Sequence, residues 1–584
     1  MSSASSSGPG TARVFALLIV DSALSDISPI RQGDDRNVKP SVVMVILRDD
    51  RLELEYARFP ESSTVTMLCD LTGEPYATIV KPWTSIGSRF GTERCAMNPV
   101  PVRSPLTRIV ATVGPASESA DVIERMIRAG VTTFRLNFSH GNHDRHEMVY
   151  RRIRELAARL ERPTTILQDL QGPKLRIGDL EKDEPFEVMT GDVMRICTHP
   201  VRGNSKRIST SYADLGKDVR AGDHILIDDG LIELLVTDVD QDTEWGDEIV
   251  AEVVHGGLVK PQKGINLPGT NVSAAAMTNK DIADLEFGVQ LGVDMVALSF
   301  VRSPLDVTDA KRRIRELGGS QPLISKIEKP QAVQALEAIV DASDGLMVAR
   351  GDLGVELSTE QVPLVQKRLI RLANQAGKPV ITATQMLESM IENPRPTRAE
   401  ASDIANAILD GTDAVMLSGE TAVGKWPVRT VETMAQIART IECDPSWHRA
   451  MRTISGERQA VDETTVSSAI AYAAASLAKD VKATAVVVLT ASGLTAERVS
   501  QQRPGMPILA FADRAEVAAR LSLWHGIVPV HEPLAGNSEA LRRQIDQGIR
   551  RLGYASTGDR IVTVGRAPHG DNASALFLQF HELV

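Results

Sequence analysis

Short apolar runs alternate with amphipathic helical segments along most of this chain, and that alternation restricts its fold more than any other feature. Three such runs precede residue 177 and five follow residue 267, at residues 108–113, 132–138, 164–170, 295–300, 323–327, 345–349, 379–384 and 413–417. Apolar runs of this length are typical of buried parallel strands, and strand–helix–strand units join such strands through right-handed connections. Eight units of this kind predict a (β/α)8 TIM barrel.

The alternation is interrupted between residues 178 and 267. There the chain shows short strand patterns separated by turns, such as Asp228-Asp229-Gly230 between residues 224–227 and 231–236. Closely spaced short strands with turn residues are typical of an all-β unit. We therefore predict a small β-barrel lid domain at residues 178–267, inserted into a barrel domain formed by residues 104–177 and 268–443.

The remaining residues fall into two further segments. In residues 444–584 strand patterns again alternate with helical ones, which predicts a separate C-terminal open α/β domain. Residues 1–103 carry no recognisable chemistry. For them we expect either a poorly ordered N-terminal extension or residues added by an upstream start codon.

Composition excludes several classes of function. A chain of 584 residues is too long for one hydrophobic core, and its formal charge of −11 argues against nucleic-acid binding. No apolar run approaches the ~20 residues that cross a bilayer, so we expect no membrane association. The four cysteines are far apart, form no metal-ligand pattern and predict a reducing, cytoplasmic environment.

Charged residues follow two consecutive predicted strands in the stretch Leu323–Asp352. Lys326 and Glu328 are two apart, so they share one face of a strand, and the next strand ends in Arg350-Gly351-Asp352. Functional groups in parallel α/β folds collect at the carboxyl ends of the strands. Two carboxylates leave coordination positions for water and substrate oxygens, as Mg²⁺ prefers. The pattern therefore predicts a divalent-cation site.

Cationic side chains follow the ends of other predicted strands. Arg135 lies in the second strand, and Lys174 and Arg176 follow the third. Together with Lys326 they would gather positive charge at one mouth of the barrel, as phosphoryl transfer requires. Gly351 would let backbone N–H groups approach an anion at the start of a helix. The chain has no Walker A motif, no protein-kinase glycine loop and no Ser-His-Asp order.

Several of these residues also have simpler interpretations. Lys326 could be a surface lysine, and Glu328 could be an acidic residue at a helix N-terminus. Thr384 could be the N-cap of a helix at residues 385–391, a role that is compatible with a catalytic one.

Other charged positions are interpreted as structural. His143 and His146 are three apart on a predicted helix, and a metal pair is conceivable. Solvated positions are the better interpretation, because no third ligand is apparent. Arg151, Arg152 and Arg154 are interpreted as a solvated helix face.

Seven motifs, in order, resemble those of the pyruvate kinases. They are Arg108-Ile-Val-Ala-Thr-Val-Gly-Pro-Ala-Ser117, Phe134-Arg-Leu-Asn-Phe-Ser-His-Gly141, Ile324-Ser-Lys-Ile-Glu328, Ala349-Arg-Gly-Asp-Leu-Gly354, Thr382-Ala-Thr-Gln-Met-Leu-Glu-Ser-Met390, Asn393-Pro-Arg-Pro-Thr-Arg-Ala-Glu400 and Met416-Leu-Ser-Gly-Glu-Thr-Ala422. Each motif alone could arise by chance, but the whole set is specific. The resemblance extends from Thr107 to about Val584.

The resemblance implies transfer of the phosphoryl group of phosphoenolpyruvate to ADP, giving pyruvate and ATP in glycolysis. By analogy Glu328 and Asp352 hold Mg²⁺, with Mn²⁺ as an alternative. Lys326, Arg135 and Thr384 would be catalytic, because Lys326 and Arg135 contact the transferring phosphoryl group and Thr384 helps to protonate the enolpyruvate carbon. These residues and Gly351 would bind the substrate.

The resemblance also implies nucleotide contacts. Asn137, His140, Arg176 and, at the edge of the lid, Lys263 would contact the nucleotide phosphates. The β insert resembles a mobile lid that excludes water from the reactive phosphoryl group when it closes.

One departure concerns potassium. The motif Leu170-Gln171-Gly172-Pro173-Lys174 has Lys174 where potassium-dependent members have Glu, and Leu-Gln where they have Thr-Lys. Asn137, Ser139 and Asp169 still match the monovalent-cation site. The Lys174 ammonium would take the place of the ion, so we expect that K⁺ is not required.

The C-terminal domain resembles the effector domain of the family. The loop Thr490-Ala-Ser-Gly-Leu-Thr495 offers Thr490, Ser492, Gly493 and Thr495 to a phosphate, and a capped turn is the alternative interpretation. Asn537 and Gln544 stand where members that bind fructose bisphosphate have Trp and Arg. We therefore expect another phosphorylated sugar or a nucleotide as allosteric effector.

The family is usually tetrameric, so a homotetramer is expected. Two other functions stay open at this point. One is a non-catalytic metabolite-binding relative on the same barrel. The other is a barrel enzyme that handles phosphoenolpyruvate or pyruvate without a nucleotide, although Arg176 and the motif Lys263-Gly-Ile-Asn-Leu-Pro-Gly269 argue against it.

Overall fold

The computed structural model describes residues 104–181, 184–270, 272–273, 275–459, 465–535, 538–567 and 575–584. It also gives the backbone of three antiparallel strands, β1 (Val43–Arg48), β2 (Arg51–Tyr56) and β3 (Met67–Cys69). The rest of the predicted N-terminal extension lies outside the described residues. The chain divides into two compact units. One is built on Ser104–Glu463 and Arg514–His531, and the other includes Thr464–Asp513 and Glu532–Val584.

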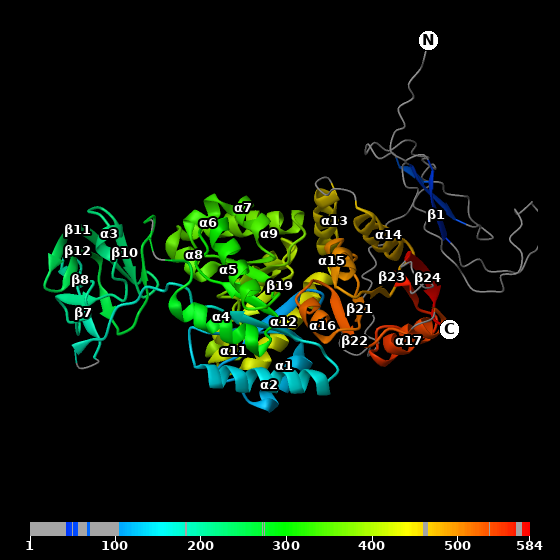
Figure 1. The fold of residues 1–584 in the computed structure, drawn as a ribbon, viewed down its shortest axis with the longest axis horizontal. Helices are drawn as coiled ribbons and strands as arrows, with labels where there is room; N and C mark the ends of the chain where they lie inside the picture. The colour runs from blue at the N-terminus through cyan, green and yellow to red at the C-terminus, as the bar shows by residue number, and fades with distance from the viewer. Residues whose placement is uncertain are drawn as a thin grey trace, which may run out of the picture. The chain divides into compact units, whose positions relative to one another are not determined.

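Eight parallel strands close into a barrel in the first unit, which confirms the predicted fold class (Figure 1). Their order around the barrel is β15-β16-β17-β18-β19-β4-β5-β6, and the parallel pairing of β15 with β6 closes it. The bounds are β4 (Arg108–Thr112), β5 (Val131–Asn137), β6 (Thr165–Asp169), β15 (Met295–Leu298), β16 (Leu323–Ile327), β17 (Gly345–Ala349), β18 (Val380–Ala383) and β19 (Ala414–Leu417). Most strand residues are buried, as expected of strands covered on both faces.

Helices follow the barrel strands. They are α1 (Ala120–Ala129), α2 (His143–Arg159), α4 (Asn279–Leu291), α5 (Pro304–Glu316), α6 (Pro330–Gln334), α7 (Leu336–Ala342), α8 (Arg350–Glu356), η2 (Thr359–Gln361), α9 (Val362–Gln375), η3 (Glu388–Ile391), α10 (Arg398–Leu409), α11 (Gly419–Ala422), α12 (Pro427–Glu442) and α13 (Pro445–Gln459). None of the helices in the described part of the chain combines the length and apolar character that spanning a membrane needs.

The sequence predicts Ser117 as the N-cap of the first barrel helix and a second helix over Glu147 to Leu160, and the structure differs at the start of both helices. Ser119 caps α1, because its side chain accepts a hydrogen bond from the Val122 N–H. The predicted cap, Ser117, instead accepts a bond from the Gly114 N–H, 3.2 Å away. The helix expected from Glu147 begins four residues earlier as α2, where the Asn142 side chain caps it. Both differences arise because a short polar side chain can bond several nearby N–H groups.

The barrel interior is filled by apolar side chains. Strand residues that include Val110, Leu167, Ile324 and Met347 form one buried cluster, and Leu523 joins it from outside the barrel strands. Leu523 follows α16 (Ala515–Leu521), and β22 (Ile527–His531) comes next; both belong to this unit. A second, larger cluster fills the layer between the strands and the surrounding helices.

The inserted segment is an all-β unit with one short helix. Its main sheet has the order β14-β10-β11-β12-β8-β9, and β13 pairs with β7. The bounds are β7 (Phe186–Val188), β8 (Val193–Cys197), β9 (Arg207–Ser209), α3 (Leu215–Asp218), β10 (His224–Ile227), β11 (Ile232–Thr243), β12 (Gly246–His255), β13 (Gly257–Val259) and β14 (Ile265–Asn266). The chain crossings, meaning the two stretches that connect the insert to the barrel, pair with each other. The Ile177 N–H bonds the Lys263 carbonyl and the Ile265 N–H bonds the Leu175 carbonyl.

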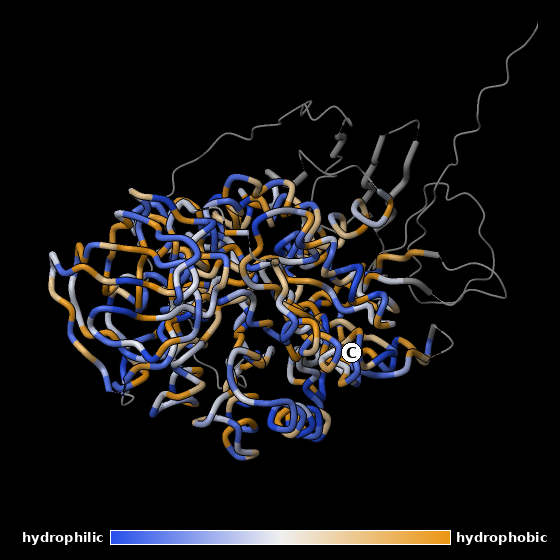
Figure 2. The backbone as a smooth tube through the Cα atoms, turned by 60° about the vertical axis from the view of Figure 1, so that its left-hand side comes forward, coloured by the Kyte–Doolittle hydropathy of each residue, from blue (hydrophilic) through white to orange (hydrophobic). Residues whose placement is uncertain are grey.

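The second unit contains an open sheet with the order β21-β20-β23-β24. Its elements are α14 (Val466–Asp480), β20 (Ala485–Leu489), α15 (Leu494–Gln501), β21 (Ile508–Ala512), α17 (Ser538–Arg551), β23 (Arg560–Ala567) and β24 (Ala575–Glu582). Strand β24 is antiparallel and was not predicted from the sequence, nor was β22. Figure 2 shows orange hydrophobic and blue hydrophilic stretches alternating along the chain, as expected where buried strands alternate with charged helices. The domain limits proposed from the sequence stay predictions.

Candidate active site

Lys326 lies in β16 and is 8% exposed, so the interpretation as a surface lysine is wrong. Its Nζ atom lies 2.7 Å from Ser299 Oγ, 2.9 Å from Glu328 Oε1 and 3.3 Å from Asp169 Oδ1. Burial would lower the pKa of Lys326, but the charges of Asp169 and Glu328 outweigh that effect and raise it. The side chain therefore presents a full positive charge inside the barrel mouth at neutral pH.

Glu328 is buried beside Lys326. Besides the lysine, it accepts a hydrogen bond at Oε2 from the Phe300 N–H, 2.6 Å away. Both oxygens of Glu328 therefore bond groups of β16 and of the segment after β15, rather than the N-terminal N–H groups of α6. Burial and the neighbouring carboxylate of Asp352 raise the pKa of Glu328.

Glu328 and Asp352 fit a hard divalent cation. Strands β16 and β17 pair in parallel, so Glu328, just after β16, and Asp352, three residues after β17, lie at the same end of the barrel. A cation between them would relieve their repulsion, and carboxylate oxygens are the ligands that Mg²⁺ prefers. Within the described ranges no group of three or more His, Cys, Asp or Glu is placed to hold a metal ion. Two protein ligands supplemented by substrate and water oxygens remain compatible with that finding.

Asp169 holds two cations side by side. Arg135 Nε lies 2.6 Å from its Oδ2, and Lys326 approaches its Oδ1. Burial would raise the pKa of Asp169, but Lys326 and Arg135 outweigh that effect and lower it. Arg135 also donates from Nη1 to Thr112 Oγ1, 3.1 Å away. The arginine is thus fixed by β4 and β6 in addition to its own strand.

Thr384 is not the N-cap that the sequence suggested. Thr384 and Gln385 have φ angles of 68° and 54°, in the left-handed region, and the next helical turn, η3, begins only at Glu388. The Thr384 hydroxyl accepts a bond from the Gly351 N–H and donates one to the Ala383 carbonyl, both at 2.7 Å. A β-branched residue rarely adopts this conformation, so these bonds hold a strained threonine beside Gly351.

A second group of cations gathers around His140. Burial lowers the pKa of His140, and the charges of Arg176, Lys174 and Arg135 lower it further. All three predicted cations therefore lie close enough to act on one imidazole. Arg176 donates from Nη1 to the Gln262 carbonyl at 2.8 Å, which ties it to the returning chain of the insert.

The other predicted nucleotide and cation-site residues have local partners. Asn137 accepts a bond at Oδ1 from the Ser139 N–H, 3.1 Å away. Lys263 pairs with Asp228 at 2.7 Å within the insert. Lys174 lies against the paired chain crossings, since its Cε would be 3.6 Å from a Cβ added to Gly264.

The helix α2 carries histidines and arginines with structural partners. His143 Nε2 lies 2.8 Å from Asp284 Oδ1, and His146 Nε2 lies 3.0 Å from the His140 carbonyl. Arg154 pairs with the buried Asp294 at 2.7 Å, so its interpretation as a solvated residue is wrong. Arg151, with 75% of its side chain exposed, fits that interpretation.

Sequence reasoning missed Thr112 and Ser299. They lie at the ends of β4 and β15, where they contact Arg135 and Lys326. Parallel barrels carry functional groups at the ends of their strands, and both residues occupy such positions. This signal in the sequence could therefore have identified both.

The predicted effector loop forms a capped turn. Thr490 Oγ1 accepts a bond from the Gly493 N–H at 2.8 Å, and Gly493, with φ of 96°, precedes α15. Gln544 bonds the backbone of Pro533 and Ala535. Asn537 lies outside the described residues.

Comparisons with known proteins agree with this architecture. Residues 104–431 match the model of the pyruvate kinase barrel domain, and residues 468–577 match that of the pyruvate kinase alpha/beta domain. A pyruvate kinase of Mycobacterium tuberculosis is 44% identical over 476 residues, 82% of this chain and 98% of the relative. One of Corynebacterium glutamicum is 44% identical over 480 residues, 82% and 97% of the two chains. Pyruvate kinase 2 of Synechocystis is 47% identical over 434 residues, 74% and 71%. The chain therefore belongs to the pyruvate kinase family.

Proposed function

We propose that this chain transfers the phosphoryl group of phosphoenolpyruvate to ADP through the site at the ends of β16 and β17. The observation that carries the proposal is the buried ammonium of Lys326, held between Asp169 and Glu328 beside Arg135. A phosphoryl group in transfer carries negative charge on its oxygens, and fixed cations in a site with little water stabilise that charge strongly. Lys326 and Arg135 would contact it.

Glu328 and Asp352 would hold the divalent cation, which neutralises charge on the phosphoryl oxygens when it is bound. Both residues follow adjacent strands, so neither depends on a long loop for its position. Gly351, next to Asp352, would leave room for the substrate because it has no side chain. Its N–H bonds the Thr384 hydroxyl, so it would hold that residue beside the substrate.

Thr384 would take part in protonating the enolpyruvate carbon. Its hydroxyl donates to the Ala383 carbonyl in the structure, so the proton is engaged. Transfer from this group would therefore require the hydroxyl to rotate away from Ala383 while the Gly351 N–H still holds the oxygen.

The nucleotide would enter the second group of cations. Asn137, His140 and Arg176 would contact its phosphates, and Lys263 would join them from the insert after leaving Asp228. Closure of the insert would exclude water from the reacting phosphoryl group.

The test is ADP-dependent formation of pyruvate, measured by coupling to NADH oxidation. We expect the wild type to be active with Mg²⁺ and the Lys326→Met variant to lose about 10²–10³-fold in kcat, as loss of a group that stabilises transition-state charge implies. Lys311→Met is the matched control, because Lys311 pairs with Asp344 away from the site, and it should keep full activity. An inactive wild type would favour a non-catalytic relative. Pyruvate release without ADP would favour the nucleotide-independent enzyme.

We further propose that the enzyme needs no K⁺, because the Lys174 ammonium takes the place of the ion at Asn137, Ser139 and Asp169. Support comes from the effect of Lys174 on the His140 pKa. The wild type should be as active in tetramethylammonium chloride as in KCl, whereas Lys174→Glu should become dependent on added K⁺. Strong activation of the wild type by K⁺ would contradict this proposal and leave the phosphoryl-transfer proposal intact.

A phosphorylated metabolite is proposed as allosteric effector at Thr490, Ser492, Gly493 and Thr495, in a homotetramer. The loop precedes the N-terminus of α15, where backbone N–H groups favour anions. Kinetics with a panel of sugar phosphates and nucleotides test the effector site. Light scattering, which measures mass, tests the homotetramer. No response to any effector would count against regulation at this loop.

A further inference from the structure

A buried ion pair is formed by residues close in sequence to the two carboxylates proposed to hold the divalent cation. Lys329 follows Glu328 in the chain, and Glu356 lies one helical turn after Asp352 in α8. Lys329 Nζ is 2.6 Å from Glu356 Oε1, and the two side chains are 14% and 1% exposed. The pair therefore joins the segment that carries Glu328 to the segment that carries Asp352.

Further contacts connect this pair to its surroundings. Lys329 Nζ lies 5.6 Å from the ring centroid of Phe300, whose N–H bonds Glu328. Phe300 has a φ of 55°, so its backbone is held in a conformation that non-glycine residues rarely adopt. Asn266 Nδ2, at the end of the insert, donates to Glu356 Oε1 over 2.9 Å.

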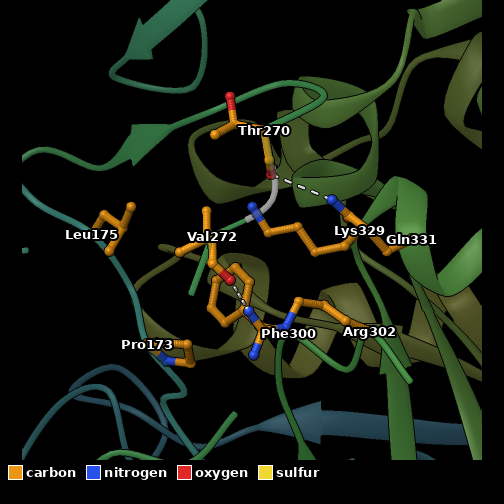
Figure 3. Close-up of a pocket in the computed structure, with 8 residues that line it drawn as sticks. All are labelled: Pro173, Leu175, Thr270, Val272, Phe300, Arg302, Lys329 and Gln331. Carbon is orange, nitrogen blue, oxygen red and sulfur yellow. Dashed lines mark hydrogen bonds between the residues drawn. The ribbon is translucent and has the colours of Figure 1, made fainter. Parts of the chain in front are cut away.

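The chain that returns from the insert is fastened in the same place. Figure 3 shows Lys329 and Gln331 beside Thr270, with Arg302 reaching Val272. Gln331 Nε2 donates to the Thr270 carbonyl at 3.3 Å, and Arg302 donates to the Val272 carbonyl. The Lys329–Glu356 pair thus lies beside the segments that carry Glu328 and Asp352 and beside the residues where the insert rejoins the barrel.

We propose that Lys329 and Glu356 are positioning residues that set the distance between Glu328 and Asp352. The hydrogen bond from Asn266 to Glu356 would link the insert to this pair. The proposal rests on the metal role of Glu328 and Asp352. Mg²⁺ demands near-ideal ligand geometry, so the affinity of a site with two protein ligands depends on their separation. Groups that orient metal ligands commonly change affinity 10–100-fold when they are removed.

A merely structural pair would behave differently. Its loss would lower the melting temperature and leave the affinity of the folded site for the cation unchanged. The decisive readout is therefore cation binding without substrates, measured by electron paramagnetic resonance with Mn²⁺ as the probe. Melting temperature is recorded alongside for every variant.

The experiment compares three variants of the full chain. Lys329→Met should weaken Mn²⁺ binding about tenfold. Lys329→Arg keeps a cation within reach of Glu356 and should restore binding to within about twofold of the wild type, in line with the strength of charged hydrogen bonds to carboxylates. Lys311→Met breaks the pair with Asp344, which lies just before β17 at its opposite end, and should leave Mn²⁺ affinity unchanged.

Milder variants keep the test valid if Lys329→Met does not fold. Glu356→Gln keeps the shape of the side chain and removes its charge, and it should also weaken Mn²⁺ binding. Asn266→Ala removes one hydrogen bond from the insert and should raise the KM for ADP more than the KM for phosphoenolpyruvate, because Asn266 lies three residues after Lys263.

Each outcome separates the two proposals. A wild type that neither binds Mn²⁺ nor forms pyruvate defeats the proposed function. A wild type that does both, together with Lys329→Met and Glu356→Gln variants of unchanged Mn²⁺ affinity, overturns the positioning role alone. A loss that Lys329→Arg fails to restore in a folded protein overturns it as well.

Discussion

A lysine buried in a barrel keeps its proton only where nearby negative charge compensates for lost hydration. Lys326 meets that condition through Asp169, Glu328 and Asp352, which together outweigh the effect of burial on its pKa. Asp169 stays ionised for the reciprocal reason, because Lys326 and Arg135 lie against it. The charges at this mouth therefore depend on one another, and a change to one side chain alters the protonation of its neighbours.

Because of His146, the stability of the folded state should decrease at acid pH. Its ring stacks on Phe138 with centroids 4.1 Å apart, and burial lowers its pKa below the ordinary value. The stabilising effect of the neutral ring is complete above the unfolded-state pKa of about 6.5 and is lost as pH falls below it. The melting temperature of the wild type should fall between pH 7.5 and 5.5, and His146→Gln should show a shallower fall. Parallel pH profiles would contradict this.

Cys197 should be chemically inert in the folded protein. Burial and the neighbouring Glu248 raise the pKa of its thiol to about 12, so almost no thiolate exists at pH 8.5. Iodoacetamide at that pH should leave the Cys197 peptide unmodified and alkylate the exposed Cys443, as measured by mass spectrometry. Comparable labelling of both cysteines would show that Cys197 is more accessible than its burial implies.

At the scale of elements, helix α4 packs against β6 at a glycine. Gly288 of α4 faces the buried Gln168, whose Nε2 donates to the Asp284 carbonyl at 2.6 Å. A Cβ added at Gly288 would lie 2.0 Å from Gln168 Oε1. Neither group can move without breaking that hydrogen bond or separating the helix from the strand.

Gly288→Ala should therefore destabilise the protein by about 1–3 kcal/mol, the usual cost of overpacking a buried contact. Gly456→Ala is the matched control, because it also lies in a helix but has nothing within 4 Å of an added Cβ. That variant should be neutral or stabilising by about 0.5–1 kcal/mol. Urea unfolding measures both, and a neutral Gly288→Ala would contradict the close packing.

At the scale of the whole molecule, the barrel is completed by a segment distant in sequence. Residues Arg514–His531 belong to the barrel unit, and Leu523 packs with side chains of the barrel interior. Thr165 of β6 donates to the Ala519 carbonyl at 2.6 Å, and the Gly526 N–H bonds the Leu106 carbonyl. The barrel unit therefore includes a segment that comes after its last strand, β19, in the sequence.

Leu523→Ala should lower the free energy of unfolding by about 2–5 kcal/mol, as expected for a large-to-small change at a fully buried site. The exposed Leu364 provides a control, since Leu364→Ala should change stability by less than about 0.5 kcal/mol. Calorimetry of both variants checks the contrast. Equal melting temperatures would mean that Leu523 adds nothing to the barrel core.

Much of the site followed from residue spacing alone. Lys326, Glu328 and Asp352 were predicted together because strand ends meet at one edge of a parallel barrel, whatever the details of the loops. The alternative interpretation of Thr384 as an N-cap is wrong, because its backbone is left-handed and its hydroxyl bonds the N–H of Gly351 at the start of α8. Ser117 was misread because two nearby serines offered equivalent caps.

The sequence by itself determined the barrel, the insert and the strand-end charges, because periodicity and turn residues act over a few neighbours in the chain. Only the tertiary structure showed that Arg154 pairs with Asp294, that Glu356 lies against Lys329, and that Leu523 packs with the side chains of the barrel interior. These contacts join residues 27 or more positions apart. No local pattern encodes such pairs, since they depend on how separate elements pack together.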